Sequence, residues 1–339
     1  MRLSEFDYEL PPELIAQEPL PERDGSRLLH MLPGRRFEHL LFAALPNLLE
    51  PGDVLVLNDT KVFPARLTGA RASGGRVELL LLEDCGDARW RVLAKPARKL
   101  RAGAQLTFGD GRLVAEVVGA DTDRLVVRFE HDGAFADVID ALGTTPLPPY
   151  IRSSESEPAI RDRYQTVYAT DRGSIAAPTA GLHFTEDVLK RLVERDIDVA
   201  RLTLHVGYAT FEPIRTDIVE EHAMGVEHFH VPRETAELVR AGRTVIAVGT
   251  TSVRALESAA RIDFSPGWHE TDLFITPGFE FRVVSGLVTN FHLPKSSLLM
   301  LVSALGGTDR VRAAYGEAVK ERYRFYSYGD CMLLPPPRL

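Results

Sequence analysis

The alternation of apolar and polar residues changes its period twice along the chain. In residues 61–149, short stretches alternate with a period of two and are separated by turns at Ser73–Gly75 and Gly109–Gly111. These hairpins and their neighbours give five or six short strands, which suits a small closed antiparallel β-barrel. We therefore expect residues 61–149 to form an inserted barrel domain.

Residues 1–60 and 150–339 mix helical and strand periods, as expected of a discontinuous domain with a mixed α/β (α+β) fold. The pattern predicts a buried strand over Thr244–Val248 and helices over Glu234–Ala241, Ser252–Arg261, Ser296–Leu305 and Thr308–Tyr323. The sequence therefore predicts a large mixed α/β domain with a small inserted barrel domain.

One predicted strand in this domain carries a histidine on its polar side. Thr185 is a good N-cap for the helix that comes before this strand. Within the strand, Leu202, Leu204 and Val206 share one face. His205 therefore lies on the opposite face, away from the core.

Composition is that of a globular protein large enough for one or two cores. The chain has 339 residues, of which 45% are apolar and 26% are charged. Its apolar runs are far shorter than the roughly 20 residues of a membrane span, and the N-terminus lacks a secretory signal, so a cytoplasmic protein is expected. Cys85 and Cys331 have no Cys or His companions at metal-ligand spacing, so we expect free thiols and no bound metal.

The net charge of −8 argues against nonspecific coating of nucleic acid, because phosphate neutralisation needs clustered Lys and Arg. The stretch Arg89–Arg101 nevertheless holds six basic residues, no acid and one tryptophan. It suits a surface that follows a phosphate backbone, and it is equally compatible with a basic strand edge that prevents aggregation. Its candidate phosphate-binding residues are Arg89, Arg91, Lys95, Arg98, Lys99 and Arg101.

The turn Gly249–Ser252 joins a buried strand to a helix N-terminus, where free N–H groups and the helix dipole favour an anion. The pattern matches no standard phosphate-binding loop, so a simple capped turn is an equal alternative. Arg254, two residues further on, favours the anion site. The candidate substrate-binding residues here are Thr250, Thr251, Ser252 and Arg254.

Two histidines have the chemistry of a general base. His183 lies in the segment Gly173–Phe184, whose small residues allow close approach of a ligand to the backbone. An imidazole there, or at His205, transfers protons near neutral pH. A lone histidine is more often a structural hydrogen-bonding group, and that alternative stays open for both.

Two polar segments near the C-terminus add further candidates. Asn290 and His292 are placed on a loop before a short helix, and such loops often carry function. The segment Tyr323–Asp330 combines aromatic rings with charge, which suits stacking of a base, although an aromatic cluster that closes the core is the commoner case. Its candidate substrate-binding residues are Arg324, Tyr328 and Asp330.

These segments resemble those of the S-adenosylmethionine:tRNA ribosyltransferase-isomerase family of the queuosine pathway. The matching segments follow in order as VLVLNDTKVFPARLTG, GSIAAPTAGLHFT, AVGTTSVRALES, LFITPGFEF and LVTNFHLPKSSLLMLVSALGG. The resemblance extends over nearly the whole chain. It implies the same mixed α/β domain with an inserted barrel.

The resemblance also implies a reaction. The ribosyl part of S-adenosylmethionine would be transferred to 7-aminomethyl-7-deazaguanine at the wobble position of tRNA and isomerised to epoxyqueuosine, with release of adenine and methionine. S-adenosylmethionine is then a co-substrate, no prosthetic group is needed, and a monomer is expected. His183 is the first candidate for the general base and His205 the second. His292, which is expected to line the same cleft as Asn290, is the third catalytic candidate.

Substrate binding is distributed over the remaining candidates. The residues Thr250–Ser252 and Arg254 are expected to bind the methionine carboxylate or the ribose hydroxyls. Asp330 is expected to read the edge of the modified base, and the stretch Arg89–Arg101 to bind the phosphates of the anticodon arm.

Two segments depart from the family pattern. The usual HVGAGTF is HVGYATF here, with Tyr208 and Ala209, and the usual MHSE is MGVE, with Gly225 in the place of a histidine. These departures support one alternative, a noncatalytic tRNA-binding protein derived from the enzyme. Because the residues show no standard S-adenosylmethionine motif, an enzyme of this fold that uses a different nucleoside donor is retained as a second alternative.

Overall fold

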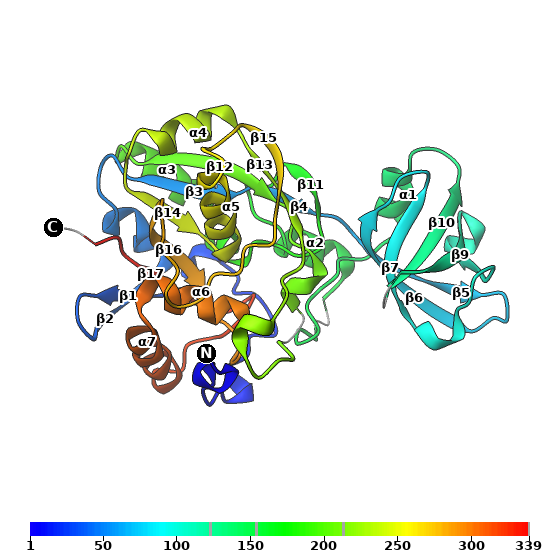
Figure 1. The fold of residues 1–339 in the computed structure, drawn as a ribbon, viewed down its shortest axis with the longest axis horizontal. Coiled ribbons are helices and arrows are strands. Elements are labelled where there is room, and N and C mark those ends of the chain that lie inside the picture. The colour runs from blue at the N-terminus through cyan, green and yellow to red at the C-terminus, as the bar shows by residue number, and fades with distance from the viewer. Residues whose placement is uncertain (122–123, 153–154, 212–213, 338–339) are drawn as a thin grey trace. The chain divides into compact units, whose positions relative to one another are not determined.

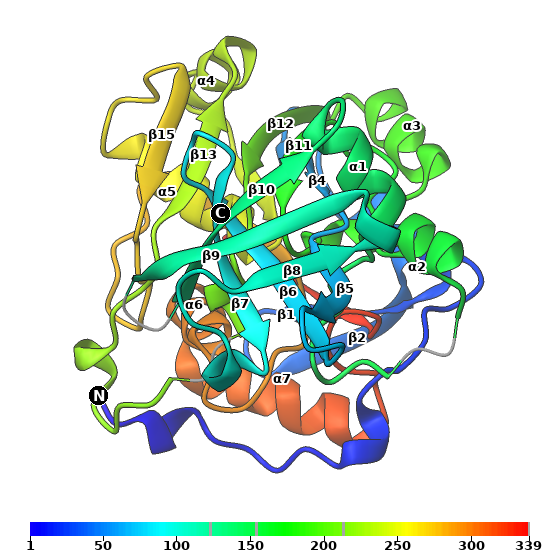
Figure 2. The ribbon, with the colours of Figure 1, turned by 90° about the vertical axis from the view of Figure 1, so that its right-hand side faces the viewer.

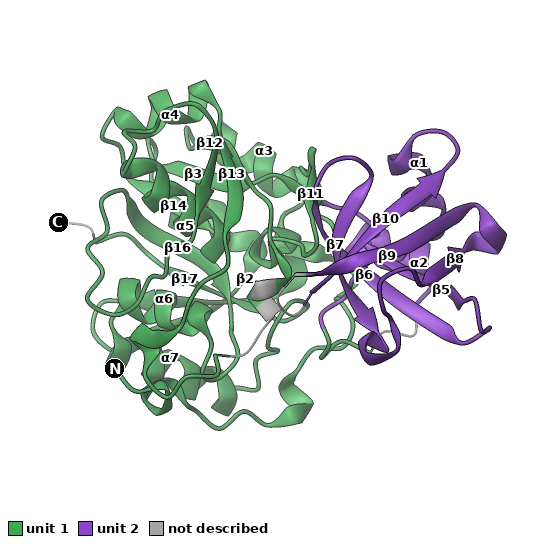
Figure 3. Ribbon diagram, turned by 45° about the vertical axis from the view of Figure 1, so that its right-hand side comes forward, with its two compact units in different colours: residues 1–61, 149–154, 165–339 green, residues 62–148, 155–164 purple. Residues whose placement is uncertain are grey.

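The computed structural model describes all of the 339-residue chain except residues 122–123, 153–154, 212–213 and 338–339. The chain forms two compact units (Figure 3). The sheet unit comprises residues 1–61, 149–154 and 165–339, and the barrel unit comprises residues 62–148 and 155–164. Residues 155–164 thus belong to the barrel unit, whereas the sequence pattern assigned them to the other domain.

The barrel unit is built on antiparallel strands that close into a barrel, as the sequence predicts (Figure 2). In spatial order they are β10 (Arg124–His131), β7 (Arg89–Lys95), β6 (Arg76–Asp84), β5 (Arg66–Arg71), β8 (Gln105–Phe108) and β9 (Leu113–Asp121). Leu67, Leu79 and Val92 are fully buried, consistent with a filled barrel interior. Helices α1 (Phe135–Leu142) and α2 (Glu157–Arg163) complete the unit.

The sheet unit contains a nine-stranded mixed sheet (Figure 1). In spatial order its strands are β15 (Gly267–Thr271), β13 (Glu227–Val231), β12 (Asp198–Leu204), β3 (Val54–Asn58), β14 (Val245–Val248), β16 (Val284–Asn290), β17 (Cys331–Leu334), β1 (Arg27–Leu32) and β2 (Arg36–Leu41). A separate short pair is formed by β4 (Thr60–Val62) and β11 (Asp171–Ser174). The strands β12, β3, β14 and β16 are parallel, so their carboxyl ends meet at one edge.

The central strands are apolar on both faces because helices cover both. On β3, Val54 and Val56 enter the core that includes α4 to α7, while Leu55 and Leu57 enter the core that includes α3. The helices are α3 (Glu186–Glu194), α4 (Arg233–Arg240), α5 (Thr250–Ala260), α6 (Ser297–Gly306) and α7 (Thr308–Lys320). None of the helices in the described part of the chain is long and apolar enough to cross a membrane.

Local signals explain where these elements begin and end. The Thr185 hydroxyl accepts a hydrogen bond from the Val188 N–H at 3.2 Å, which confirms the predicted N-cap of α3. Helix α5 begins at Thr250, two residues before the predicted start, because Gly249 turns the chain at a φ of 85°. Asn290 ends β16, whereas the sequence placed it on a loop.

Short 3-10 helices make up many of the connections. They are η1 (Leu3–Phe6), η2 (Pro12–Leu14), η3 (Arg23–Gly25), η4 (Phe42–Leu48), η5 (Ala97–Lys99), η6 (Gly109–Gly111), η7 (Thr179–His183), η8 (Tyr208–Phe211) and η9 (Val219–Glu221). One of them, η7, ends on the candidate residue His183.

Candidate active site

The carboxyl ends of the parallel strands carry several of the candidate residues. His205 directly follows β12, the turn Gly249–Ser252 follows β14, and Asn290 ends β16. In open α/β sheets, ligands bind outside the carboxyl ends of parallel strands, since the loops that follow them converge there. The sheet unit therefore has the expected location for an active site at this edge.

His205 lies half-buried at this edge, on the face opposite the apolar side chains of β12, as the sequence predicts. Its Nδ1 lies 2.8 Å from the Thr60 hydroxyl, which is also placed to donate to the Asp171 carbonyl at 3.5 Å. This arrangement favours a proton on Nδ1 and a lone pair on Nε2. A Cβ on Gly173 would lie 2.5 Å from Nε2 and 2.6 Å from Cε1, over the face of the ring, so the glycine lets the backbone pack closely against the imidazole.

Two carboxylates lie beside His205. Asp59 is 8% exposed and accepts hydrogen bonds from the Thr203 hydroxyl at 2.7 Å and the Thr170 hydroxyl at 3.1 Å. A carboxylate oxygen of Asp171 lies 3.4 Å from the same Thr203 hydroxyl. Burial raises the pKa of Asp59, although its two hydroxyl partners oppose the shift. Burial also lowers the pKa of His205, against the pull of Asp171, so the imidazole is neutral at neutral pH.

His183 lies deeper. It is 4% exposed and packs against the Phe42 ring at 5.2 Å, and its Nδ1 lies 2.7 Å from the Ser26 hydroxyl. Burial lowers the pKa of His183 to about 4, and the nearby guanidinium groups of Arg324 and Arg23 add to this effect while Asn290 opposes it. The imidazole is therefore uncharged over the physiological range.

Three polar atoms at His183 are buried, and the Asn290 side chain interacts with the imidazole. They are His183 Nε2, Asn290 Oδ1 and Arg324 Nη1. The Asn290 amide nitrogen donates to the Tyr326 carbonyl at 3.0 Å, which fixes the amide.

His292 stands apart from these groups in its interactions. Its Nε2 lies 2.8 Å from the Thr289 hydroxyl, and its backbone N–H donates to the Tyr315 hydroxyl at 2.9 Å. Burial lowers the pKa of His292 to about 3. These contacts favour a structural role for this histidine.

Three residues with hydroxyl groups begin α5, and two of these hydroxyls form hydrogen bonds within the protein. The Thr251 hydroxyl accepts from the Asn58 amide at 3.2 Å, and the Ser252 hydroxyl donates to the Val248 carbonyl at 2.7 Å. Thr250 is 6% exposed. Asn58 also binds the Leu204 backbone through both its amide atoms and so joins the ends of β3 and β12.

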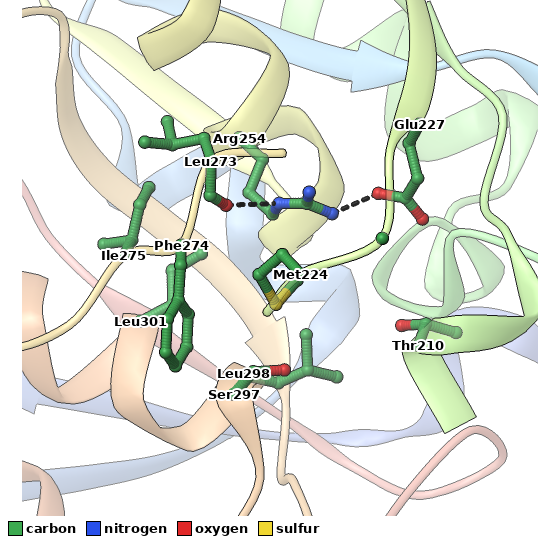
Figure 4. A pocket seen from close by; sticks show the side chains of 11 residues that line it. Thr210, Met224, Glu227, Arg254, Leu273, Phe274, Ile275, Ser297, Leu298 and Leu301 are labelled. Atoms are coloured by element: carbon green, nitrogen blue, oxygen red, sulfur yellow. Dashed lines mark hydrogen bonds and ion pairs between the residues drawn. The ribbon is translucent and has the colours of Figure 1, made fainter. Parts of the chain in front are cut away.

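Arg254 lies in a buried ion pair beside a small pocket (Figure 4). Its Nε donates to the Leu273 carbonyl at 2.9 Å, and its Nη1 pairs with Glu227. Glu227 also accepts from the Gly207 N–H at 3.0 Å. The guanidinium thus joins three chain segments, whereas the sequence placed it at the anion site of the α5 turn.

The pocket beside this ion pair is small, with a cavity volume of about 20 Å³. Its lining includes Thr210 and Gly225, alongside apolar residues such as Met224 and Phe274 (Figure 4). Both segments that depart from the family pattern therefore meet at this pocket.

The segment Tyr323–Asp330 is anchored by the carboxylate of Asp330. Asp330 is 2% exposed, and its two oxygens accept from the backbone N–H groups of Arg27 and Arg324, each at 2.8 Å. Tyr328 is buried. These contacts favour an anchoring role for Asp330 over direct reading of a base.

In the barrel unit, the basic stretch is partly neutralised. Arg89 pairs with Asp87 at 2.8 Å, and Arg91 pairs with Glu83. The side chains of the other basic residues in the stretch are exposed: Lys95, Arg98, Lys99 and Arg101.

The structure brings His183, Asn290 and Arg324 together, while His205 forms a second centre with residues that the sequence analysis did not single out. Those residues are Asp59, Thr60, Asp171 and Trp268, and Ser26 was missed beside His183. The motif NDTK contained Asp59 and Thr60, so the polar run after a buried strand was an available signal. No such signal marks Trp268 or Ser26.

Among the described residues, no group of three or more His, Cys, Asp or Glu is arranged to hold a metal ion.

Together, the fold and its polar edge define an α/β enzyme with its site at the carboxyl ends of parallel strands. Comparison with known proteins identifies the kind of enzyme. The sequence model for the family described as queuosine biosynthesis protein matches residues 3–334. The chain belongs to this family.

Its relatives cover it almost completely. An S-adenosylmethionine:tRNA ribosyltransferase-isomerase from Symbiobacterium thermophilum is 52% identical over 344 residues, and one from Halothermothrix orenii is 51% identical over 346 residues. Both alignments cover 98% of this chain and 100% of the relative. The crystal structure of S-adenosylmethionine tRNA ribosyltransferase from Thermotoga maritima is similar, with 39% identity, a TM-score of 0.54 and coverage of 98% and 100%. The chain is accordingly a transferase of the ribosyltransferase-isomerase type.

Proposed function

We propose that this protein transfers the ribosyl part of S-adenosylmethionine to 7-aminomethyl-7-deazaguanine at the wobble position of tRNA. Isomerisation of the sugar gives epoxyqueuosine, and adenine and methionine leave. The observation that carries the proposal is the near-complete coverage by relatives at about 50% identity that bear this enzyme name. The polar edge of the sheet supplies the groups that such a reaction needs.

The reaction begins with a proton transfer. The sulfonium makes the adjacent 5′ carbon acidic, so a base removes a proton there, the sugar opens with loss of adenine, and the aminomethyl nitrogen attacks. Methionine then leaves as the epoxide closes. His205 is our general base, because its half-buried, neutral imidazole keeps a lone pair on Nε2 while Thr60 fixes Nδ1.

His183 contributes differently. Its burial supports a neutral imidazole that is held by the Ser26 hydroxyl and does not gain charge during the reaction. Arg324, whose buried Nη1 lacks a partner among the described residues, suits the methionine carboxylate. Thr250 and Thr251 at the start of α5 suit the ribose hydroxyls.

The exposed basic residues of the barrel unit are proposed to bind tRNA phosphates. Charge reversal at Arg98 and Lys99 should raise KM for tRNA several-fold and reduce the dependence of binding on salt, because fewer counterions are released. Titration of tRNA at several salt concentrations measures this slope. Charge reversal at two exposed basic residues of the sheet unit, Lys190→Glu/Arg233→Glu, is the matched control. An unchanged slope in Arg98→Glu/Lys99→Glu removes these residues from the tRNA footprint.

One assay tests the proposed function. The purified protein is incubated with S-adenosylmethionine and a tRNA that carries 7-aminomethyl-7-deazaguanine, and the digested nucleosides and free adenine are analysed by mass spectrometry. Epoxyqueuosine together with adenine is the expected result. Tight binding of this tRNA without either product would favour a noncatalytic tRNA-binding protein.

A further inference from the structure

Three rings form a row on the sheet face that carries His205. The Trp268 ring lies between His205 and His230, with ring centroids 5.1 Å and 5.2 Å away. The interplanar angles are 31° and 41°, so the rings are tilted and do not meet edge to face. The strand register explains the row, because Trp268 on β15 is directly opposite His230 on β13, and β13 is paired with β12 just before His205.

Trp268 is unusually open for a tryptophan that contacts two other rings. Its side chain is 50% exposed, and β15 is an edge strand of the sheet. Neighbouring β15 residues face the other way: the His269 ring packs against Phe229 in the core. The indole therefore presents an aromatic surface to solvent beside the candidate base.

The charges around this surface select its ligand. Asp171 is linked to His205 through the Thr60 hydroxyl, and Glu270, on the same face of β15 as Trp268, is 67% exposed and lies 3.7 Å from Nδ1 of His228. Two carboxylates disfavour a phosphate group at this position. They favour a flat ring that carries a positive charge, because a ring stacks on indole and a cation is attracted to both the carboxylates and the indole face.

We propose that Trp268 is the platform on which the acceptor base stacks, with its aminomethyl group, a primary ammonium at neutral pH, directed toward Asp171. This inference rests on the proposed function, since it takes 7-aminomethyl-7-deazaguanine as the acceptor. It replaces Asp330 as the residue that receives the base, because both oxygens of Asp330 are bound to backbone N–H groups. It also brings the aminomethyl nitrogen close to His205, and the ammonium becomes the attacking amine once it has given a proton to the Asp171 carboxylate.

The chain offers a direct spectroscopic test because it has only two tryptophans, Trp90 and Trp268. In a Trp90→Phe background, Trp268 is the sole tryptophan and its fluorescence reports on the platform. An RNA hairpin of the anticodon arm with 7-aminomethyl-7-deazaguanine should quench this fluorescence on binding. Quenching by S-adenosylmethionine alone, with none by the hairpin, would assign the platform to the donor and overturn the proposal.

Substitutions provide the second test, with the complete protein and the same hairpin. Trp268→Leu should raise the dissociation constant of the hairpin about 10-fold and leave that of S-adenosylmethionine unchanged, whereas Trp268→Phe should retain most of the affinity. Val193→Ala, at an exposed apolar residue of α3, is the control for loss of apolar surface in general. Equal hairpin affinity in Trp268→Leu and wild type would overturn the proposal.

A comparison of two hairpins tests the role of the carboxylate. The hairpin with the aminomethyl group should bind more tightly than one with unmodified guanine, and Asp171→Asn should remove most of this difference. An undiminished preference in Asp171→Asn would exclude the proposed orientation of the base.

If the wild type forms epoxyqueuosine while Trp268→Leu binds and turns over normally, the proposed function stands and the platform fails. If the hairpin quenches Trp268 but no product forms, the platform stands and ribosyl transfer fails.

Discussion

His183 and His205 differ in access, although each has a hydroxyl group on its Nδ1. Ser26 lies 2.7 Å from Nδ1 of His183, and Thr60 lies 2.8 Å from Nδ1 of His205. His183 is 4% exposed, with its other nitrogen enclosed, whereas His205 is half-buried. The same pairing of a hydroxyl group with Nδ1 thus occurs in an enclosed environment at His183 and in a half-buried one at His205.

The comparison separates two uses of a neutral imidazole. A sealed imidazole pays a large desolvation cost on gaining a proton, and so it serves as a fixed hydrogen-bonding group. An open imidazole with one nitrogen fixed can accept a proton from a substrate and pass it to water. Access, more than the identity of the hydrogen-bond partner, therefore distinguishes the proposed general base from its neighbour.

The largest effect is expected from the open histidine. His205→Gln should lower kcat by about 10²- to 10⁴-fold, the usual contribution of a general base, with little change in KM for S-adenosylmethionine. Steady-state kinetics with the modified tRNA measure both constants. His269→Gln is the matched control, because His269 lies next to Trp268 in sequence but on the opposite face of β15.

The pH profile of kcat/KM strengthens this test. Burial lowers the pKa of His205 below its ordinary value near 6.5, so the acid limb of the wild-type profile should lie below pH 6.5. That limb should be absent from the residual activity of His205→Gln. Near-normal turnover in His205→Gln, with intact folding, would return the base assignment to His183.

The buried histidine, His183, should affect how the free energy of unfolding depends on pH. Its pKa is about 4 in the folded protein and near 6.5 when unfolded, so the unfolded chain binds a proton first as pH falls. Stability is then complete above pH 6.5 and declines toward pH 4, by up to about 3 kcal/mol from this group. His183→Gln should make the decline shallower. Urea unfolding between pH 4.5 and 7, followed by Trp268 fluorescence in a Trp90→Phe background, measures it for the sheet unit.

His292 is the internal control for this measurement. Burial lowers its pKa to about 3, so it contributes a slope of the same sign, which should persist in His183→Gln. An unchanged slope in His183→Gln would mean that His183 gains its proton as readily in the folded protein as in the unfolded one. The contrast with His205 would then disappear.

Much of the fold could be predicted from the sequence, because its signals are local. Glycine turns and a period of two marked the barrel, and Thr185 marked the start of α3 through a hydrogen bond to Val188, three residues away. The start of α5 was misplaced because Gly249 adopts a positive φ that ends the strand abruptly. Such a turn depends on the backbone conformation of one residue, which periodicity does not report.

The candidate site was less predictable because its contacts join distant segments. The orientation of His205 followed from strand alternation, but its partner Thr60 is 145 residues away and Ser26 is 157 residues from His183. Trp268 reaches His205 only through the pairing of three strands. A single sequence carries residue types and local periods, and it does not carry the strand order that brings these side chains together.

The smallest expected effect distinguishes the two hydroxyl partners. Ser26→Ala leaves Nδ1 of a sealed imidazole without a partner and should cost about 1 kcal/mol or more of stability, because water cannot replace the hydroxyl. Thr60→Val should cost less, roughly 0.5 kcal/mol, since the half-buried His205 can turn toward water, but it should lower kcat several-fold by releasing the imidazole. Urea unfolding and steady-state kinetics on both variants give the comparison. Equal losses of stability would show that access does not separate the two environments, and an unchanged kcat in Thr60→Val would show that Thr60 does not orient the proposed base.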